Sequence, residues 1–293
     1  MKNNSNHPTG NRRKRKPFQI TMRRLLKNPS ADIGLVILLI LVFTAFFGNL
    51  LAPYDYSKLD IVHKYQQPSA AHLFGTDQFG RDIFSRILVG TKYSLLLGLL
   101  NTSVSAFFGI IIGAVSGYFG GKTDLILMRI LDVIQSIPGM LLAIAIAAVL
   151  GPGFWQVIIA IGIAGIPAFA RMSRASVLTV RNTEYIEAAV LTNCKTPQII
   201  LSHVLPNALS PLIVQFTMSI ASCILLAAGL SFIGLGVQPP TPEWGAMLSG
   251  AKDQIREYPY LMYAPGIMIM LAVLSINMIG DGLRDVLDPK LRK

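Results

Sequence analysis

Six long stretches of the sequence are apolar and carry almost no charge, and this feature constrains the chain more than any other. About 20 apolar residues in a helix cross the roughly 30 Å hydrocarbon core of a bilayer. The hydrophobic fraction is 52% and the charged fraction only 14%, which does not suit a water-soluble surface. The sequence therefore predicts an all-α polytopic membrane protein with six transmembrane helices, at about 33–52, 93–118, 125–150, 154–170, 210–229 and 260–279.

Glycine and proline divide these stretches. Gly151-Pro152-Gly153 cannot continue a helix, so the third and fourth helices are expected to form a tight hairpin. Pro138 removes a backbone donor inside the third stretch and is expected to kink that helix. Residues 204–242 carry no charge, and we expect one helix there, followed by a Gly-rich outer segment that ends at Pro239-Pro240.

Lysine and arginine fall mainly on one side of the predicted helices. With the N-terminus inside, 19 of the 26 Lys and Arg residues lie in inner segments, whereas the acidic residues divide almost evenly. Cytoplasmic segments carry such an excess, so both termini are predicted to be cytoplasmic. Residues 1–30 then form a basic cytoplasmic segment before a membrane domain at 31–293. Beside a membrane helix, the basic run at 12–16 favours a lipid surface over nucleic acid as its neighbour.

Three glycines, Gly109, Gly113 and Gly117, recur at every fourth position of the second helix and so share one helix face. Small residues allow helices to approach closely in a membrane. We expect the stripe to pack against another helix of the same chain, with dimerisation between chains as the alternative. In the third helix, Arg129 and Asp132 lie three residues apart near the inner end. Structural pairing is the favoured interpretation, and a role in gating is the alternative.

The sequence offers no signature of catalysis or metal binding. The four histidines, His7, His63, His72 and His203, are scattered over both predicted faces without a pair at metal-ligand spacing. No Gly-x-Ser-x-Gly elbow occurs. We therefore expect a non-catalytic chain that itself binds no cofactor and no metal.

The predicted cytoplasmic loop at 171–207 has the pattern of a helical hairpin. Asn182 and Thr183 are good caps, and Glu184 and Glu187 suit the positive end of a first turn. Asn193 tolerates the left-handed conformation that ends a helix. A second helix then begins with Thr196 as cap and Pro197 at its first position, and Pro206 is expected to limit it. Its apolar stripe predicts contact with a protein groove, through Ile199, Ile200, His203 and Val204.

Glu187-Ala188-Ala189, a turn, and then Leu205-Pro206 resemble the EAA loop of ATP-binding cassette importer permeases. Asn193 stands where that family has glycine. The resemblance implies that the loop forms a coupling helix held in a cleft of an ATPase subunit. The coupling residues are then expected to be Glu184, Glu187, Ala188, Ala189, Asn193, Pro197, Ile199, Ile200, His203 and Pro206.

Residues 72–86, 230–245 and 280–289 resemble the C-type permease subunit of dipeptide, oligopeptide and nickel importers. The resemblance implies a heterodimer with a second permease subunit, two cytoplasmic ATPases that bind ATP and magnesium, and an extracytoplasmic substrate-binding protein. It implies location in a bacterial or archaeal plasma membrane, with di- or oligopeptides as the most common cargo and nickel or metal chelates or glutathione as alternatives.

A cluster of charges precedes the second helix, and its members Asp77, Arg81, Asp82 and Arg86 recur at helical spacing. Trp244 begins a segment expected to lie along the outer interface. We expect these two segments to flank the outer mouth, with their charges forming internal pairs rather than binding substrate.

The leading hypothesis is thus a pore subunit that gives a small solute alternating access, driven by partner ATPases. An ion-coupled secondary transporter is the rival from another class, but it would need buried carboxylates near the midplane, and Asp132 is the one carboxylate anywhere near. An intramembrane enzyme is a second rival that lacks its catalytic groups.

Overall fold

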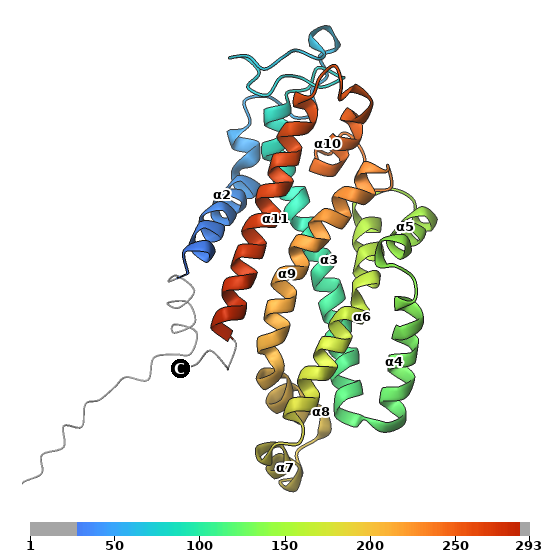
Figure 1. Cartoon of the computed structure of the whole chain (residues 1–293). Helices are drawn as coiled ribbons and strands as arrows, with labels where there is room; N and C mark the ends of the chain where they lie inside the picture. The colour runs from blue at the N-terminus through green and yellow to red at the C-terminus, as the bar shows by residue number, and fades with distance from the viewer. Residues whose placement is uncertain (1–27, 288–293) are drawn as a thin grey trace, which may run out of the picture.

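The structure, a computed structural model, describes residues 28–287 of the 293 and folds them into a bundle of long helices (Figure 1). The predicted basic segment 1–30 lies almost wholly outside these residues. The long helices of the described part are α2 (Pro29–Leu51), α3 (Ile83–Phe119), α4 (Gly121–Gln135), α5 (Gly139–Leu150), α6 (Phe154–Val180), α9 (Leu205–Phe232) and α11 (Tyr260–Leu287). The short helices are α7 (Glu184–Leu191), α8 (Thr196–Ile199) and α10 (Trp244–Ala251).

The prediction of a polytopic membrane protein is confirmed. Within residues 28–287, five helices are long and apolar enough to cross a membrane, and a sixth crossing results if α4 and α5 together count as one. One of the five is continuous from Thr196 to Phe232. The hairpin predicted at Gly151-Pro152-Gly153 is present, because α5 ends at Leu150 and α6 begins at Phe154.

The third predicted helix, 125–150, is not one kinked helix but two helices that meet at 81°. Pro138 has an extended backbone (φ −52°, ψ 130°), and α5 begins directly after it at Gly139. A missing N–H followed by glycine lets the chain leave the helical path completely. The expected kink is therefore a full break, with α4 and α5 moving in different directions.

Several of the described helices extend beyond the predicted membrane spans, α3 and α6 by ten residues each at one end. α3 begins at Ile83, ten residues before the predicted start, because Asp82 caps it by accepting a 2.7 Å hydrogen bond from the Ser85 N–H. α6 continues to Val180, ten residues past the predicted end. Charge in these extensions is tolerated because they lie at the two ends of the bundle.

The prediction that Pro206 limits the second loop helix is wrong. Residues 200–204 form a turn of π-helix, in which the Leu205 N–H donates to the Ile200 carbonyl five residues earlier. This wider turn lets the helix pass Pro206, which lacks a donor and sits in the first turn of α9. The hairpin is thus joined to a membrane helix without a break.

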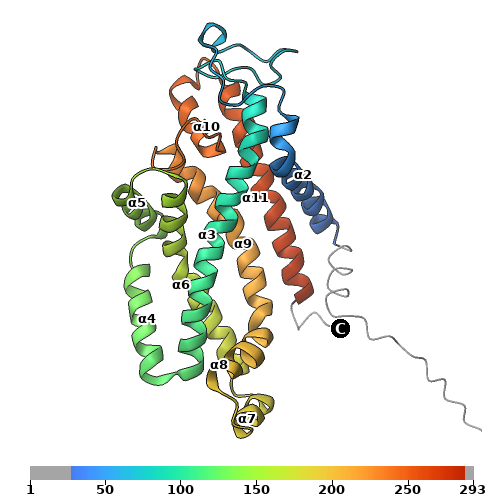
Figure 2. The ribbon, with the colours of Figure 1, turned by 180° about the vertical axis from the view of Figure 1, so that it is seen from behind.

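α3 runs through the middle of the bundle. Seen from behind, α6 lies on one side of it and α11 and α2 on the other (Figure 2). The loop at 52–82 and α10 lie at one end, and α7 projects from the opposite end (Figure 1). Asn28 and Asp285 approach within 3.5 Å, so the start of α2 and the end of α11 are neighbours.

Candidate functional site

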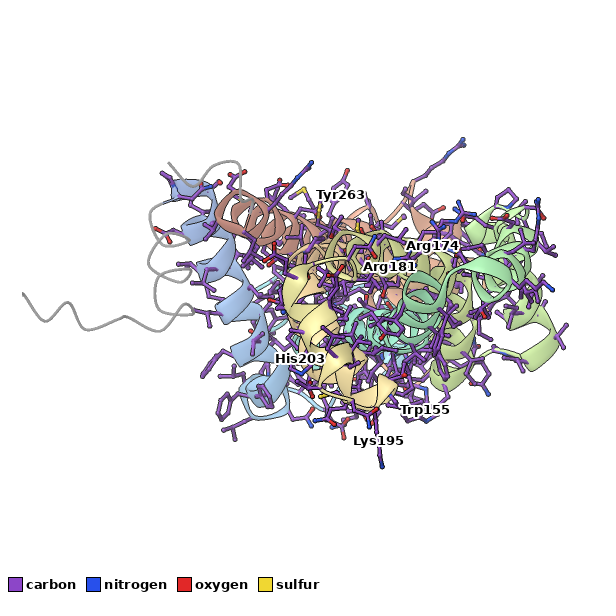
Figure 3. The ribbon with its side chains drawn as sticks, turned by 90° about the horizontal axis from the view of Figure 1, so that it is seen from below. Trp155, Arg174, Arg181, Lys195, His203 and Tyr263 are labelled. Atoms are coloured by element: carbon purple, nitrogen blue, oxygen red, sulfur yellow. The ribbon has the colours of Figure 1, made fainter. Side chains whose placement is uncertain are left out.

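The hairpin of α7 and α8 projects from the end of the bundle opposite the loop 52–82 (Figure 1). Asn193 has φ +58°, the left-handed conformation predicted for it, and the Cys194 N–H donates to the Ala189 carbonyl across the turn. The second helix begins at Thr196 with Pro197 in its first turn. Figure 3 looks at this end of the molecule and shows Lys195 extending away from it, with His203 nearby.

One face of the hairpin is buried within the chain itself. Ile186 and Ala189 of α7 and Ile199 of α8 pack with Val177 and Val180 of α6. Ile199 is only 2% exposed and Val204 is fully buried. The prediction that Ile199 contacts a partner is therefore wrong, because the hairpin folds back onto α6 and uses this apolar stripe for its own attachment. Ile200 is half-buried against the same cluster.

The opposite face of the hairpin is exposed and apolar. Leu191 is 86% exposed, Leu201 65% and Val190 53%, and Tyr185 is exposed beside them. None of these four was among the predicted coupling residues. The sequence could have indicated this, because Ile186 and Ala189 at a spacing of three define the inner face of α7 and leave Ala188 and Leu191 on the other, with Tyr185 and Val190 at the edges. Of the predicted set, Glu184, Glu187, Ala188, Pro197 and Pro206 are also exposed.

At the other end, the predicted charge cluster forms internal ion pairs. Arg81 Nε lies 2.7 Å from Asp77 Oδ2, and Arg86 Nε lies 3.7 Å from the same oxygen. Asp77 and Arg81 lie in a loop, so their helical spacing does not reflect a helix. The buried Asp82 accepts from Ser85 and pairs with His72 Nδ1 at 2.9 Å. These contacts fasten the loop 52–82 to α3.

Trp244 does not lie along an outer interface but is fully buried at the start of α10. Glu243, also buried, caps α10 with both oxygens, which accept from the N–H groups of Gly245 and Ala246 at 2.8 Å. Burial raises the pKa of Glu243, and these hydrogen bonds oppose the shift. The Trp244 indole faces the Ile87 carbonyl of α3. α10 is therefore inserted into this end of the bundle.

The stripe of Gly109, Gly113 and Gly117 faces α6 of the same chain. A Cβ added at Gly109 would lie 2.5 Å from the Phe169 Cβ, and one at Gly117 would lie 3.0 Å from the Val177 Cβ. Both separations are shorter than ordinary van der Waals contact. The preferred interpretation of the stripe, close packing within one bundle, is confirmed for α3 and α6.

Two ion pairs join α4 to α6, and the sequence did not reveal either. Asp124 accepts from both Nε and Nη2 of Arg174, and Ser116 also donates to Asp124. Asp132 lies 2.7 Å from Arg171 Nη2 but 3.9 Å from its predicted partner Arg129. The predicted pair exists, yet the closer contact joins two residues that are 39 positions apart on different helices, which periodicity within one helix could not show.

Two family models match the sequence. Residues 109–293 match the binding-protein-dependent transport system inner membrane component, and residues 16–68 match the N-terminal transmembrane domain of oligopeptide transport permease C. The dipeptide transport system permease protein DppC of Alkalihalophilus pseudofirmus is 44% identical, covering 94% of this chain and 91% of its own. The glutathione transport system permease protein GsiD of Pectobacterium atrosepticum is 43% identical, with 95% and 93% covered.

A solved structure shares the fold. A chain of the MetNI methionine ABC transporter in an inward-facing conformation superimposes with a TM-score of 0.56 at 18% identity. The superposition covers 69% of this chain and 96% of that one. At this identity the similarity concerns the arrangement of helices alone.

Proposed function

We propose, since this chain belongs to the family of binding-protein-dependent transport system inner membrane components, that it is the pore-forming permease subunit of an ATP-binding cassette importer of di- or oligopeptides. The relatives that match over most of their length are named as dipeptide, di/tripeptide and glutathione permeases. The chain is then a multi-pass protein of a bacterial inner membrane, and peptides are favoured over nickel or metal chelates as its cargo.

One observation supports the coupling role above all others. The α7–α8 hairpin is anchored by its buried face and presents an exposed apolar face at Leu191, and Leu201 is exposed on the π-helical turn that follows α8. Such a face, on an element rigidly joined to α9, can transmit a displacement of a bound ATPase into the membrane helices. Two cytoplasmic ATPases, which bind ATP and magnesium, a second permease subunit and an extracytoplasmic binding protein complete the proposed assembly.

The proposal fixes an orientation: the α7 end and both termini lie in the cytoplasm, and loop 52–82 lies outside. Cysteines at two highly exposed positions test it, Val62 (87% exposed) and Leu191 (86% exposed). In a chain with Cys194→Ser, an impermeant maleimide added to intact cells should label Val62→Cys but not Leu191→Cys. Inside-out vesicles should give the reverse result, and the same result in both preparations would refute the orientation.

The function itself is tested by reconstitution. The complete complex in proteoliposomes should take up a labelled dipeptide only with ATP and the binding protein. Competition by glutathione against uptake of the labelled dipeptide tests whether glutathione is an alternative cargo. Uptake driven by a proton or sodium gradient without ATP would instead support the ion-coupled secondary transporter.

A further inference from the structure

A cavity of about 600 Å³ lies at the α7 end of the bundle, between α6, α9 and α11. Half of the residues that line it are polar: Ser176, Thr179, Asn207, Ser210, Gln215 and Arg284. The helices that form it are otherwise apolar enough to cross a membrane. Most of these polar residues lie beyond the predicted spans 154–170, 210–229 and 260–279, so the cavity offers its polar groups to a solute at the α7 end of the bundle.

Arg284 is the charged residue of this lining, which includes no carboxylate. Within residues 28–287, no carboxylate oxygen lies within 4.0 Å of its guanidinium, whereas Arg81, Arg86, Arg171 and Arg174 each have an acidic partner. The lining therefore carries one positive charge, and Asp281 and Asp285, which flank Arg284 on α11, are not part of it. A planar guanidinium presents paired donors that match the two oxygens of a carboxylate, so the expected ligand group is a carboxylate.

The neutral polar residues offer mainly acceptors. The amide nitrogen of Asn207 already donates to the His203 carbonyl at 2.7 Å, and that of Gln215 donates to Ser219 at 3.2 Å. The hydroxyl of Thr179 likewise donates to a backbone carbonyl within α6, that of Ser176. Each amide nitrogen keeps a second N–H, so the groups left free on these side chains are the amide oxygens and hydroxyl lone pairs, which accept, and one amide N–H each. The oxygen atoms among these groups accept hydrogen bonds from N–H groups and from an ammonium.

The remaining lining is apolar and adaptable. Met172 of α6 and Met218 of α9 contribute flexible thioether chains, and Val214 and Leu287 lie beside them. Methionine adjusts to apolar groups of different shape. The volume falls within the usual 300–1,000 Å³ of small-molecule sites. A ligand with a fixed backbone and variable side chains would fit all three parts of the lining.

We propose that this cavity is a binding site for peptide within the membrane subunit, in which Arg284 holds the C-terminal carboxylate. The acceptors of Asn207 and Gln215 face the peptide N–H groups and ammonium, and the methionines accommodate the side chains. This inference rests on the proposed function, since it assigns a binding site for the cargo of the same importer. Because Arg284 recognises a group common to all peptides, the site binds without selecting a sequence.

The test is protection of a cysteine placed in the cavity. Thr179→Cys, in a chain with Cys194→Ser, is assembled with its partners in inside-out vesicles and labelled with an impermeant maleimide. Dialanine at about twice its dissociation constant should slow labelling about threefold. The same dipeptide with a C-terminal amide should protect far less, because it lacks the carboxylate. Equal protection by the two, or by neither, would overturn the proposal.

Two variants of Arg284 test whether this residue binds the C-terminal carboxylate of the peptide. Arg284→Gln should abolish protection by dialanine, and Arg284→Lys, which keeps the charge, should restore part of it. Arg256→Gln removes one exposed arginine near the other end of the bundle and should leave protection unchanged. Protection that survives Arg284→Gln would refute the role of Arg284. If Arg284→Gln fails to assemble, protection in Arg284→Lys and the difference between dialanine and its C-terminal amide still test the proposed site.

Uptake by the parent complex separates this inference from the function it rests on. ATP-dependent peptide uptake without protection of Thr179→Cys would refute the cavity site alone. Absence of peptide uptake by the parent complex would refute the proposed function.

Discussion

Gly113 of α3 lies directly against the backbone of Ala170 on α6, so closely that a β-carbon at position 113 would overlap the Ala170 carbonyl oxygen. The Cβ of Ser173 is also only 2.6 Å from that point. α3 and α6 share the most extensive contact between any two helices of the described chain. In lipid, where no hydrophobic drive brings helices together, such close contact supplies the dispersion energy that holds them.

Substitution of Gly113 by leucine should therefore separate α3 from α6. We expect Gly113→Leu to lower the free energy of unfolding by about 1–3 kcal/mol, as an overpacked side chain does, and to slow peptide uptake. Ile111→Leu is the matched control, because Ile111 is 48% exposed on the other side of α3. Thermal melting of the purified complex measures the difference, and equal melting temperatures for the two variants would contradict it.

Substitutions on the exposed face of the hairpin should affect ATPase binding or coupling, whereas substitutions on its buried face should affect folding. Leu191→Asp should weaken co-purification of the ATPase subunits or uncouple ATP hydrolysis from uptake, while the melting temperature of the permease stays unchanged. Ile199→Asp should instead destabilise the hairpin by several kcal/mol, because a carboxylate would be buried in the cluster with Val177. Leu191→Met keeps volume and polarity and should behave as the parent. Normal coupling in Leu191→Asp would show that the ATPase contacts another surface.

The bidentate pair of Asp124 and Arg174 should stabilise the attachment of α4 to α6. Both side chains are partly exposed, at 21% and 34%, so solvent screening limits the effect to about 1 kcal/mol. Asp124→Asn should lower the melting temperature, and a double-mutant cycle with Arg174→Gln should give a coupling energy of that size. Arg129→Gln is the control, since Arg129 is 76% exposed and 3.9 Å from its partner. Zero coupling between Asp124 and Arg174 would contradict this prediction.

Glu243 predicts a pH dependence of stability. Its carboxyl is buried, and burial raises its pKa above the ordinary value of 4.5. The folded state therefore holds the proton more tightly than the unfolded state, and the stabilisation is complete below pH 4.5 and is lost as the pH rises through the raised pKa. Melting temperatures of the parent should fall over this range. Glu243→Gln cannot ionise, and we expect a flatter profile; an unchanged slope would assign the pH dependence to another group.

A second consequence concerns the cap itself. Glu243→Ala leaves the N–H groups of Gly245 and Ala246 without acceptors inside the bundle, which should cost about 2 kcal/mol at any pH. Glu257→Ala removes an exposed carboxylate that caps no helix N-terminus, between α10 and α11; it is the control and should change little. Protection of the α10 amides from hydrogen exchange reports the loss locally, and full protection in Glu243→Ala would contradict the capping role.

Length and hydropathy determined the membrane class, because the thickness of a bilayer sets the length of apolar chain that must cross it. Local chemistry likewise predicted the turn at Asn193 and the hairpin at Gly151-Pro152-Gly153, since each depends on the backbone of a few adjacent residues. The motifs at 187–206 and 230–245 indicated the permease family. All of these features depend on residues that are near one another in the chain.

Tertiary structure decided which side of each element is used. The apolar stripe of Ile199 and Val204 could have faced a partner or the chain itself, and only the position of α6 shows that it is internal. Arg171 and Arg174 gain their carboxylate partners from α4, and Arg284 lines a cavity formed by three helices far apart in sequence. The periodicity of one helix reveals that a face is distinct, but burial and ion pairing depend on which other helix approaches that face, and that is a property of the whole bundle.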